Sequence, residues 1–286
     1  MRARANLLWS VRREIWEHRY LYIAPLVIAG LALFGFFVAG LTHMTRRLPL
    51  LHAGKQLNVV VMPYSLAASV ILVTGWIVGI VYCVEALNAE RRDRSILFWK
   101  SMPVSDLVTV ASKASIPLAV LPLIGCTIAL ATQIVMLLAN TGLLLATTGS
   151  AAVLRDNLPL PTMTLVMLYG VAVHVLWFAP IYAWLLLVSA WARRAAFPWA
   201  VLPFIAINIL ELVTLGTSWF AHAMQYRIIG AMPLAFTADA MKGPITQLSQ
   251  LAPMKFLGSP DLWLGLAFAV AFLAAAVWLR RNREPN

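Results

Sequence analysis

The sequence predicts an all-α fold: a polytopic membrane helix bundle with about six transmembrane helices, an N-terminal cytoplasmic surface helix and short helices in the last external loop. Hydrophobic residues make up 62% of the 286 residues, charged residues only 12%, and the mean hydropathy is +0.83. These values lie outside the range of soluble domains. The few charges are clustered, and most of the apolar intervals between them reach the roughly 20 residues that cross a bilayer core. Residues 1–286 are therefore expected to form a single transmembrane domain.

The amino-terminal segment 1–19 is predicted to be a helix lying on the cytoplasmic surface. One arc of that helix carries the apolar residues Leu7, Leu8, Val11 and Ile15, and another carries the charged residues Arg13, Glu14 and Glu17. The indole rings of Trp9 and Trp16 flank the apolar arc. Indole rings favour the depth of the lipid headgroups, and amphipathic helices lie in that layer. A frayed basic tail is the alternative interpretation.

Six apolar segments are long enough to be membrane spans. They cover about 20–41, 63–87, 115–138, 165–191, 197–215 and 261–280. The third is interpreted as one helix, with residues 143–154 outside the bilayer, because a second helix there would be short and rich in hydroxyl groups. The fifth continues past Glu211, which places one carboxyl group near a membrane face.

The distribution of basic residues predicts the orientation. Of the 22 Lys and Arg residues, fifteen fall in the two termini and in the second and fourth loops. Cationic residues of short loops stay in the cytoplasm, so both termini are expected there. The formal charge of +11 then reflects membrane orientation and contact with anionic lipid, and no nucleic-acid partner is expected.

The last external loop, residues 217–260, is unusually apolar for a segment outside the bilayer. Gly and Pro residues divide it into short pieces. Because backbone that is not helical must be buried in protein at membrane depth, we expect short re-entrant or surface-lying helices that cap the external end of the bundle.

The second cytoplasmic loop, residues 88–114, carries the most information about function. A dense cluster of charges is followed at once by the apolar run of residues 96–99, which includes Phe98 and Trp99. Exposed aromatic side chains rimmed by charge are typical of a protein-binding element. Pro103 ends a first helical piece, and Ser105 or Asp106 can cap a second one. The pattern predicts a helix-break-helix elbow that projects from the membrane.

Residues 90–106 read ERRDRSILFWKSMPVSD, and this run resembles the loop of bacterial ABC-2 class exporter permeases. In that family the loop commonly reads ERRDGSILFWKSLPVSD and is followed by a lysine, which Lys113 matches. The chain departs from the pattern at Arg94, where glycine is usual, and at Met102, where leucine is usual. The motif covers about one tenth of the chain, and the layout of spans also fits the family.

The resemblance implies a permease subunit of the bacterial inner membrane that forms a homodimer or heterodimer and docks on a cytoplasmic ATP-binding cassette ATPase. Closure of the ATPase subunits would push the loop and switch the bundle between two states. Charged residues would orient the contact and aromatic ones anchor it. The residues expected to couple to the ATPase are Glu90, Arg91, Arg92, Asp93, Ser95, Phe98, Trp99, Lys100 and Pro103.

No enzymatic chemistry is expected of the chain itself. It contains no phosphate loop of the G-x-x-x-x-G-K-[ST] type, so ATP and Mg²⁺ are expected on the partner subunit, with no cofactor and no metal bound directly. Polar residues inside spans often mark a transport pathway, and His174, Glu85 and Glu211 are the candidates. The favoured interpretation is structural for all three: Glu85 and Glu211 mark the water boundary, and His174 is hydrogen-bonded between packed helices.

Two other classes of function remain open. The first is an ATP-independent secondary carrier, which would use ionisable residues in the middle of spans and an internal repeat. His174 is the only mid-span candidate for such a residue. The second is a membrane scaffold or sensor that transports nothing. Substrate identity is not readable from the sequence, because bundles of this kind handle drugs, peptides, lipids and ions.

Overall fold

The computed structural model describes residues 2–52, 56–92, 105–148, 158–192, 195–242, 245 and 247–282. The described chain is helical, and its one β-bridge, between Phe236 and Leu251, is isolated. Six helices or helical runs are long and apolar enough to cross a membrane. The protein is therefore the polytopic helix bundle that its composition predicts.

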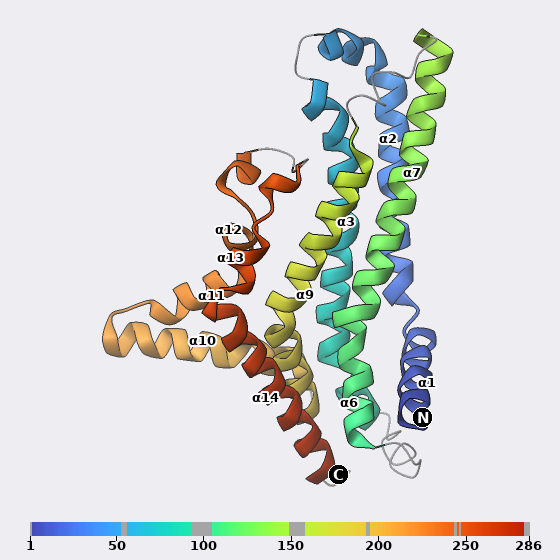
Figure 1. The fold of residues 1–286 in the computed structure, drawn as a ribbon. Coiled ribbons are helices and arrows are strands. Elements are labelled where there is room, and N and C mark those ends of the chain that lie inside the picture. The colour runs from blue at the N-terminus through green and yellow to red at the C-terminus, as the bar shows by residue number, and fades with distance from the viewer. Residues whose placement is uncertain are drawn as a thin grey trace.

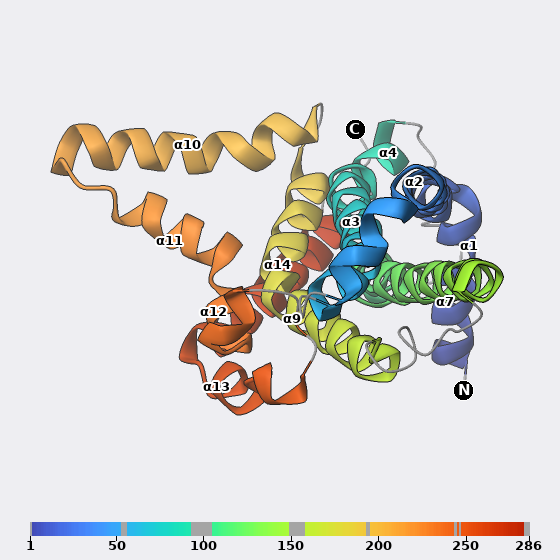
Figure 2. The same cartoon turned by 90° about the horizontal axis from the view of Figure 1, so that it is seen from above.

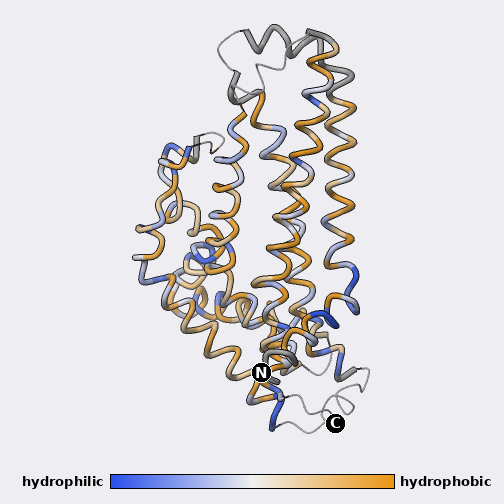
Figure 3. The backbone as a smooth tube through the Cα atoms, turned by 45° about the vertical axis from the view of Figure 1, so that its right-hand side comes forward, coloured by the Kyte–Doolittle hydropathy of each residue, from blue (hydrophilic) through white to orange (hydrophobic). Residues whose placement is uncertain are grey.

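Four long helical segments form the body of the bundle (Figure 1). They are α2 (Tyr20–His52), α3 (Gln56–Glu85), the run from α6 (Asp106–Ser115) through η1 (Ile116–Val120) to α7 (Leu121–Thr148), and α9 (Leu160–Trp191). α14 (Pro260–Asn282) packs along α9. Figure 1 places both termini at one end of the bundle, which we call the termini end. The tube in Figure 3 is largely hydrophobic along these helices.

The long helices exceed several of the predicted spans. α2 continues to His52, and the third segment is a single helical run that ends at Thr148, ten residues after the predicted end at about 138. The Asn140 side chain donates a hydrogen bond to the Tyr64 hydroxyl on α3 at 3.1 Å. The helix therefore continues through a segment whose composition favours a turn, because its polar group has a partner on a neighbouring helix.

The helix geometry of the third segment changes near Pro117. Pro117 has no N–H to donate, and the segment Ile116–Val120 is a π-helix in which the Leu121 N–H bonds to the Ile116 carbonyl. Short π segments often lie at functional positions in helices. This one directly follows α6, so it joins the second loop to α7.

α1 (Arg2–Glu17) and α10 (Ala196–Leu215) do not run with the bundle. Seen from above, α1 crosses one side of the bundle at the termini end, and α10 projects away from the opposite side (Figure 2). α10 has the length predicted for the fifth span, but α11 (Trp219–Ile229) returns from its tip toward the bundle. We call α10 and α11 together the arm.

The remaining short elements form the apolar loop before α14. They are α12 (Ala231–Ala235), η2 (Ala238–Lys242), η3 (Leu248–Gln250) and α13 (Pro253–Leu257). Their buried side chains, such as Phe236 and Phe256, pack with Val173 and Trp177 of α9. Trp177 lies near the middle of α9, and its Nε1 donates to the Arg227 carbonyl at 2.7 Å. The loop therefore folds back onto the bundle as short helices, as its apolar composition predicts. It packs beside the middle of α9, however, and does not cap the end of the bundle opposite the termini.

Candidate functional site

Six charged side chains meet at the termini end of the bundle, and we call them the ionic cluster. They come from α1, α4 (Asn88–Arg92), α6 and α14, and they are Arg13, Glu14, Glu90, Asp106, Lys113 and Arg280. Three are cationic and three anionic, so their formal charges cancel. Segments at opposite ends of the sequence thus converge on one electrostatic site.

Lys113 lies at the centre of the ionic cluster. Its Nζ is 3.0 Å from Glu14 Oε1 on α1 and 3.1 Å from Glu90 Oε1 on α4. One ammonium therefore joins the amino-terminal helix to the segment that begins the second loop. Glu14 has two further donors, Arg13 Nη2 at 2.8 Å and the Tyr82 hydroxyl at 2.7 Å.

Arg280 joins the two ends of the second loop. Its Nη1 donates to Glu90 Oε2 at 2.6 Å, and its Nε donates to Asp106 Oδ1 at 3.0 Å. Glu90 precedes residues 93–104 in the sequence and Asp106 follows them. A single guanidinium on α14 therefore holds both ends of the loop, with the fixed geometry that a planar fork of N–H donors provides.

Four members of the ionic cluster are almost inaccessible to solvent. The side chains of Glu14, Glu90, Lys113 and Arg280 are 1%, 7%, 2% and 4% exposed. Burying a charge is unfavourable unless it is paired and hydrogen-bonded, and removing one partner of a buried pair costs about 3–5 kcal/mol. The arrangement therefore resists any movement that separates the four helices.

The electrostatics of Glu14 show how strongly the ionic cluster favours the charged state. Burial raises the pKa of this carboxyl, but the Lys113 ammonium and the hydrogen bonds from Tyr82, Lys113 and Arg13 outweigh burial and lower the pKa to about 2. The pKa of the neighbouring His18 is lowered, first because the ring is partly buried. Glu14 is therefore an anion across the physiological pH range.

A second set of contacts fixes the turn between α3 and α4. The Ser189 hydroxyl of α9 accepts hydrogen bonds from the main-chain N–H groups of Leu87 and Asn88, each at 3.0 Å. The Asn88 side chain donates to the Ala192 carbonyl at 3.1 Å. α4 therefore enters the ionic cluster from a turn that is anchored on α9.

The predicted coupling residues divide into three groups. Glu90 is a buried member of the ionic cluster. Arg91 and Arg92 are the last residues of α4, whose backbone alone the structure describes at those two positions. The others lie outside the described residues: Asp93, Ser95, Phe98, Trp99, Lys100 and Pro103.

The far side of the predicted elbow has the expected cap. α6 begins at Asp106, and Ser105 is its N-cap, accepting from the Val108 N–H at 3.3 Å. Of the two residues that could have capped this helix, Ser105 does so, and Asp106 is left to bind Arg280. The helix then carries Lys113 into the bundle.

The three candidate pathway residues lie in separate places. Glu85 is exposed at the end of α3. Glu211 is on the arm, where it accepts hydrogen bonds from the Thr217 hydroxyl and from the main-chain N–H groups of Trp219 and Phe220 at 2.7–2.8 Å. It therefore caps α11, a role for which the sequence alone gives no signal.

His174 is packed among aromatic rings of α3 and α9. Its ring stacks on Trp76, with centroids 3.8 Å apart, and on Phe178, with centroids 4.3 Å apart. Its Nε2 lies 3.0 Å from the Tyr182 hydroxyl. Both ring faces are covered, so the contacts around His174 are those of a packed helix interface.

Sequence reasoning missed most of the ionic cluster. Glu14 was expected on the polar face of a surface helix, yet it is fully buried. Lys113 was noted only as part of the motif, and Arg280 only as a residue that sets orientation. A charge at the end of an apolar span is the one signal that could have found them. Within the described ranges no group of His, Cys, Asp or Glu is arranged to hold a metal ion.

The chain was compared with protein-family models, with curated proteins and with solved structures, and none of them matches it. Its function therefore has to be inferred from two observations that meet at one place. The first is the motif of residues 90–106. The second is the ionic cluster, which holds both ends of that segment.

Proposed function

We propose that this protein is the membrane-spanning permease subunit of an ATP-binding cassette exporter of the ABC-2 class. It pairs with a second permease subunit in the bacterial inner membrane, with both termini in the cytoplasm. A separate cytoplasmic subunit binds ATP and Mg²⁺ and hydrolyses ATP. That subunit presses on residues 93–104, and the ionic cluster passes the displacement to the helix bundle.

The observation that carries the proposal is the double contact of Arg280 with Glu90 and Asp106. A displacement of the loop pulls on both carboxylates, and both are bonded to α14. α14 packs along the second half of α9, so the displacement reaches the bundle through α9. Packed helices of this kind move as rigid bodies between discrete arrangements.

Lys113 provides a second connection through which displacement of the loop reaches the helix bundle. It binds Glu14 and therefore moves α1 together with α6. It also lies three residues before the π-helical segment that begins at Ile116, where a hydrogen-bonding pattern other than that of an α-helix allows α7 to change direction relative to α6. A single displacement of the loop can thus move α14, α1 and α7 together.

Copurification tests the docking step. We expect the affinity-tagged protein, extracted from its native membrane in mild detergent, to bring down an ATP-hydrolysing subunit. Replacing Phe98 and Trp99 together with glutamate should abolish the association, because the two proposed aromatic anchors of the contact become charged. Trp16→Glu is the matched control: it adds a charge to an indole that is 64% exposed at the same end of the molecule. It should leave the association intact.

Three results would count against the proposal. They are the absence of any ATP-binding subunit from the purified protein, an association that survives the double replacement, and a loop found on the outer face by labelling of Ser95→Cys. A complex whose ATP hydrolysis responds to no transported compound would favour a scaffold or sensor.

The chemistry of His174 does not favour a proton-coupled carrier. A proton relay needs a ring with access to water or to another titratable group of the pathway. Here the ring is buried between Trp76 and Phe178, and its hydrogen-bond partner is a tyrosine of the same helix. We therefore propose no secondary-carrier function.

A further inference from the structure

The arm leaves the bundle instead of packing into it. Over an apolar stretch of 18 residues, 11% of the positions in α10 are buried, against 61% in α9. At about 1.5 Å per residue, the 20 residues of α10 extend roughly 30 Å. Figure 2 shows this extension away from α2, α3 and α7.

α10 and α11 enclose an apolar groove of about 390 Å³. Its lining comes from the arm alone: Phe204, Ile205, Asn208, Ile209, Phe220, Ala221 and Met224. The rings of Phe204 and Phe220 stack with centroids 6.1 Å apart and connect the two helices. The groove is open, and no other part of the described chain lines it.

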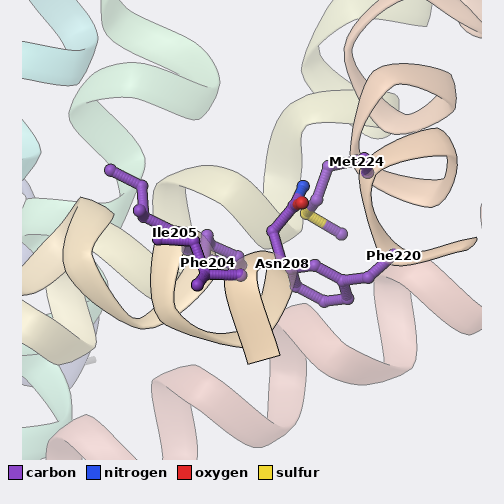
Figure 4. Close-up of a pocket in the computed structure, with 7 residues that line it drawn as sticks. Phe204, Ile205, Asn208, Phe220 and Met224 are labelled. Atoms are coloured by element: carbon purple, nitrogen blue, oxygen red, sulfur yellow. The ribbon is translucent and has the colours of Figure 1, made fainter. Parts of the chain in front are cut away.

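Asn208 is the one polar side chain of this lining. In Figure 4 its amide points toward Met224 across the groove. Over the described part of the chain the Asn208 amide has no hydrogen-bond partner, although neighbouring polar groups of the arm do, as the capping by Glu211 shows. In hydrocarbon an unpaired amide is unfavourable, and a lipid chain offers it nothing to bond.

An amide that is both donor and acceptor is complementary to itself. Two identical helices that cross about a twofold axis bring the same residue of each face to face. Asn208 lies near the middle of α10, where such a crossing gives the two arms the most contact. Asparagine side chains bond across helices in this way in membranes and fix the register of paired helices in water.

We propose that the groove of the arm is the docking site for the arm of a second copy of this chain, with the two Asn208 amides hydrogen-bonded to each other. The inference builds on the proposed permease dimer and names the surface that forms it. The partner's α10 lies in the groove, so each arm covers the apolar face that the other exposes. The dimer contact is then formed away from the ionic cluster and leaves its ion pairs unchanged.

Disulfide crosslinking tests this pairing directly. The two native cysteines, Cys83 and Cys126, are buried and are replaced by alanine. In that background we expect Asn208→Cys to form a covalent dimer on oxidation in phosphatidylethanolamine and phosphatidylglycerol vesicles. Leu138→Cys is the matched control, since Leu138 is 66% exposed on α7, on the side of the bundle opposite the arm. It should form no crosslinked dimer.

The strength of the dimer is measured separately by subunit exchange between labelled copies in the same vesicles. We expect Asn208→Leu, which keeps the branched shape of the side chain and removes the amide, to weaken dimerisation roughly tenfold. Both experiments use the chain without any ATPase, so their failure is distinct from failure of the proposed docking on an ATP-binding subunit.

Each outcome has a definite meaning. Crosslinking at position 208 but not at 138, together with the weaker dimer of Asn208→Leu, supports the proposal. It is overturned by a chain that stays monomeric in vesicles, or by equal crosslinking at the two positions; lipid or another amphipathic molecule then fills the groove. A dimer whose strength Asn208→Leu leaves unchanged overturns the pairing of the amides.

Discussion

Replacing Lys113 by methionine is the sharpest perturbation of the ionic cluster. The change keeps much of the side-chain volume but removes the ammonium that lies 3.0 Å from Glu14 and 3.1 Å from Glu90. Breaking a buried ion pair costs about 3–5 kcal/mol. Each carboxylate keeps another cation, Arg13 at 2.8 Å and Arg280 at 2.6 Å. We therefore expect the lower end of this range, about 3 kcal/mol.

The measurement is thermal unfolding in detergent, followed by tryptophan fluorescence. A loss of about 3 kcal/mol corresponds to a fall in Tm of roughly 6 °C or more in a chain of this size. Adding Glu14→Gln to Lys113→Met should recover part of the loss, because it removes a carboxylate left short of a cation. Lys255→Met is the control, since the exposed Lys255 makes a single hydrogen bond to a main-chain carbonyl at 2.8 Å. Its Tm should change by less than about 1 °C.

Two results would refute this reasoning. The first is a Lys113→Met protein that unfolds at the wild-type temperature, because the ionic cluster would then contribute no stability. The second is a double variant with Glu14→Gln that is no more stable than Lys113→Met alone. In that case the cost of the single change would come from packing and not from charge.

Three further predictions concern other contacts. The pKa of Glu14 is lowered to about 2 from an ordinary 4.5, which stabilises the folded state by about 3 kcal/mol above pH 4.5, and this stabilisation is lost as the pH falls toward 2. The difference in unfolding free energy between wild type and Glu14→Gln should therefore be larger at pH 6 than at pH 3. An equal difference at the two pH values would contradict the pairing. Ser189→Ala leaves two buried main-chain N–H groups, including that of Leu87, without their acceptor. The unfolding free energy should fall by at least about 1–3 kcal/mol, which is the range for one such group. An unchanged unfolding free energy would mean that water replaces the hydroxyl. Gly265→Ala would place a methyl group against the guanidinium of Arg227. Because only the end of a flexible side chain has to shift, we expect a small fall in Tm that reverses when Arg227 is also shortened to alanine; an unchanged single variant would show that the guanidinium moves aside freely.

The sequence by itself determined the class of the protein and the approximate positions of its six long apolar helices. The length of an apolar run fixes where a helix can cross a bilayer, because every main-chain group in hydrocarbon must bond within the helix. The cap at Ser105 and the altered helix geometry at Pro117 are likewise local, since each depends on a hydrogen bond to a residue a few positions away. The loop motif is also a property of the sequence alone.

Only the tertiary structure decided which charges meet and where α10 points. Glu14 and Arg280 are far apart in the sequence, and each reaches the ionic cluster because α1 packs against α6 and α14 packs against α9. Hydropathy does not predict such neighbours, because lipid and a packed helix are equally apolar surroundings for a span. For the same reason the composition of α10 is that of any spanning helix, and its departure from the bundle follows from contacts that the sequence pattern does not record.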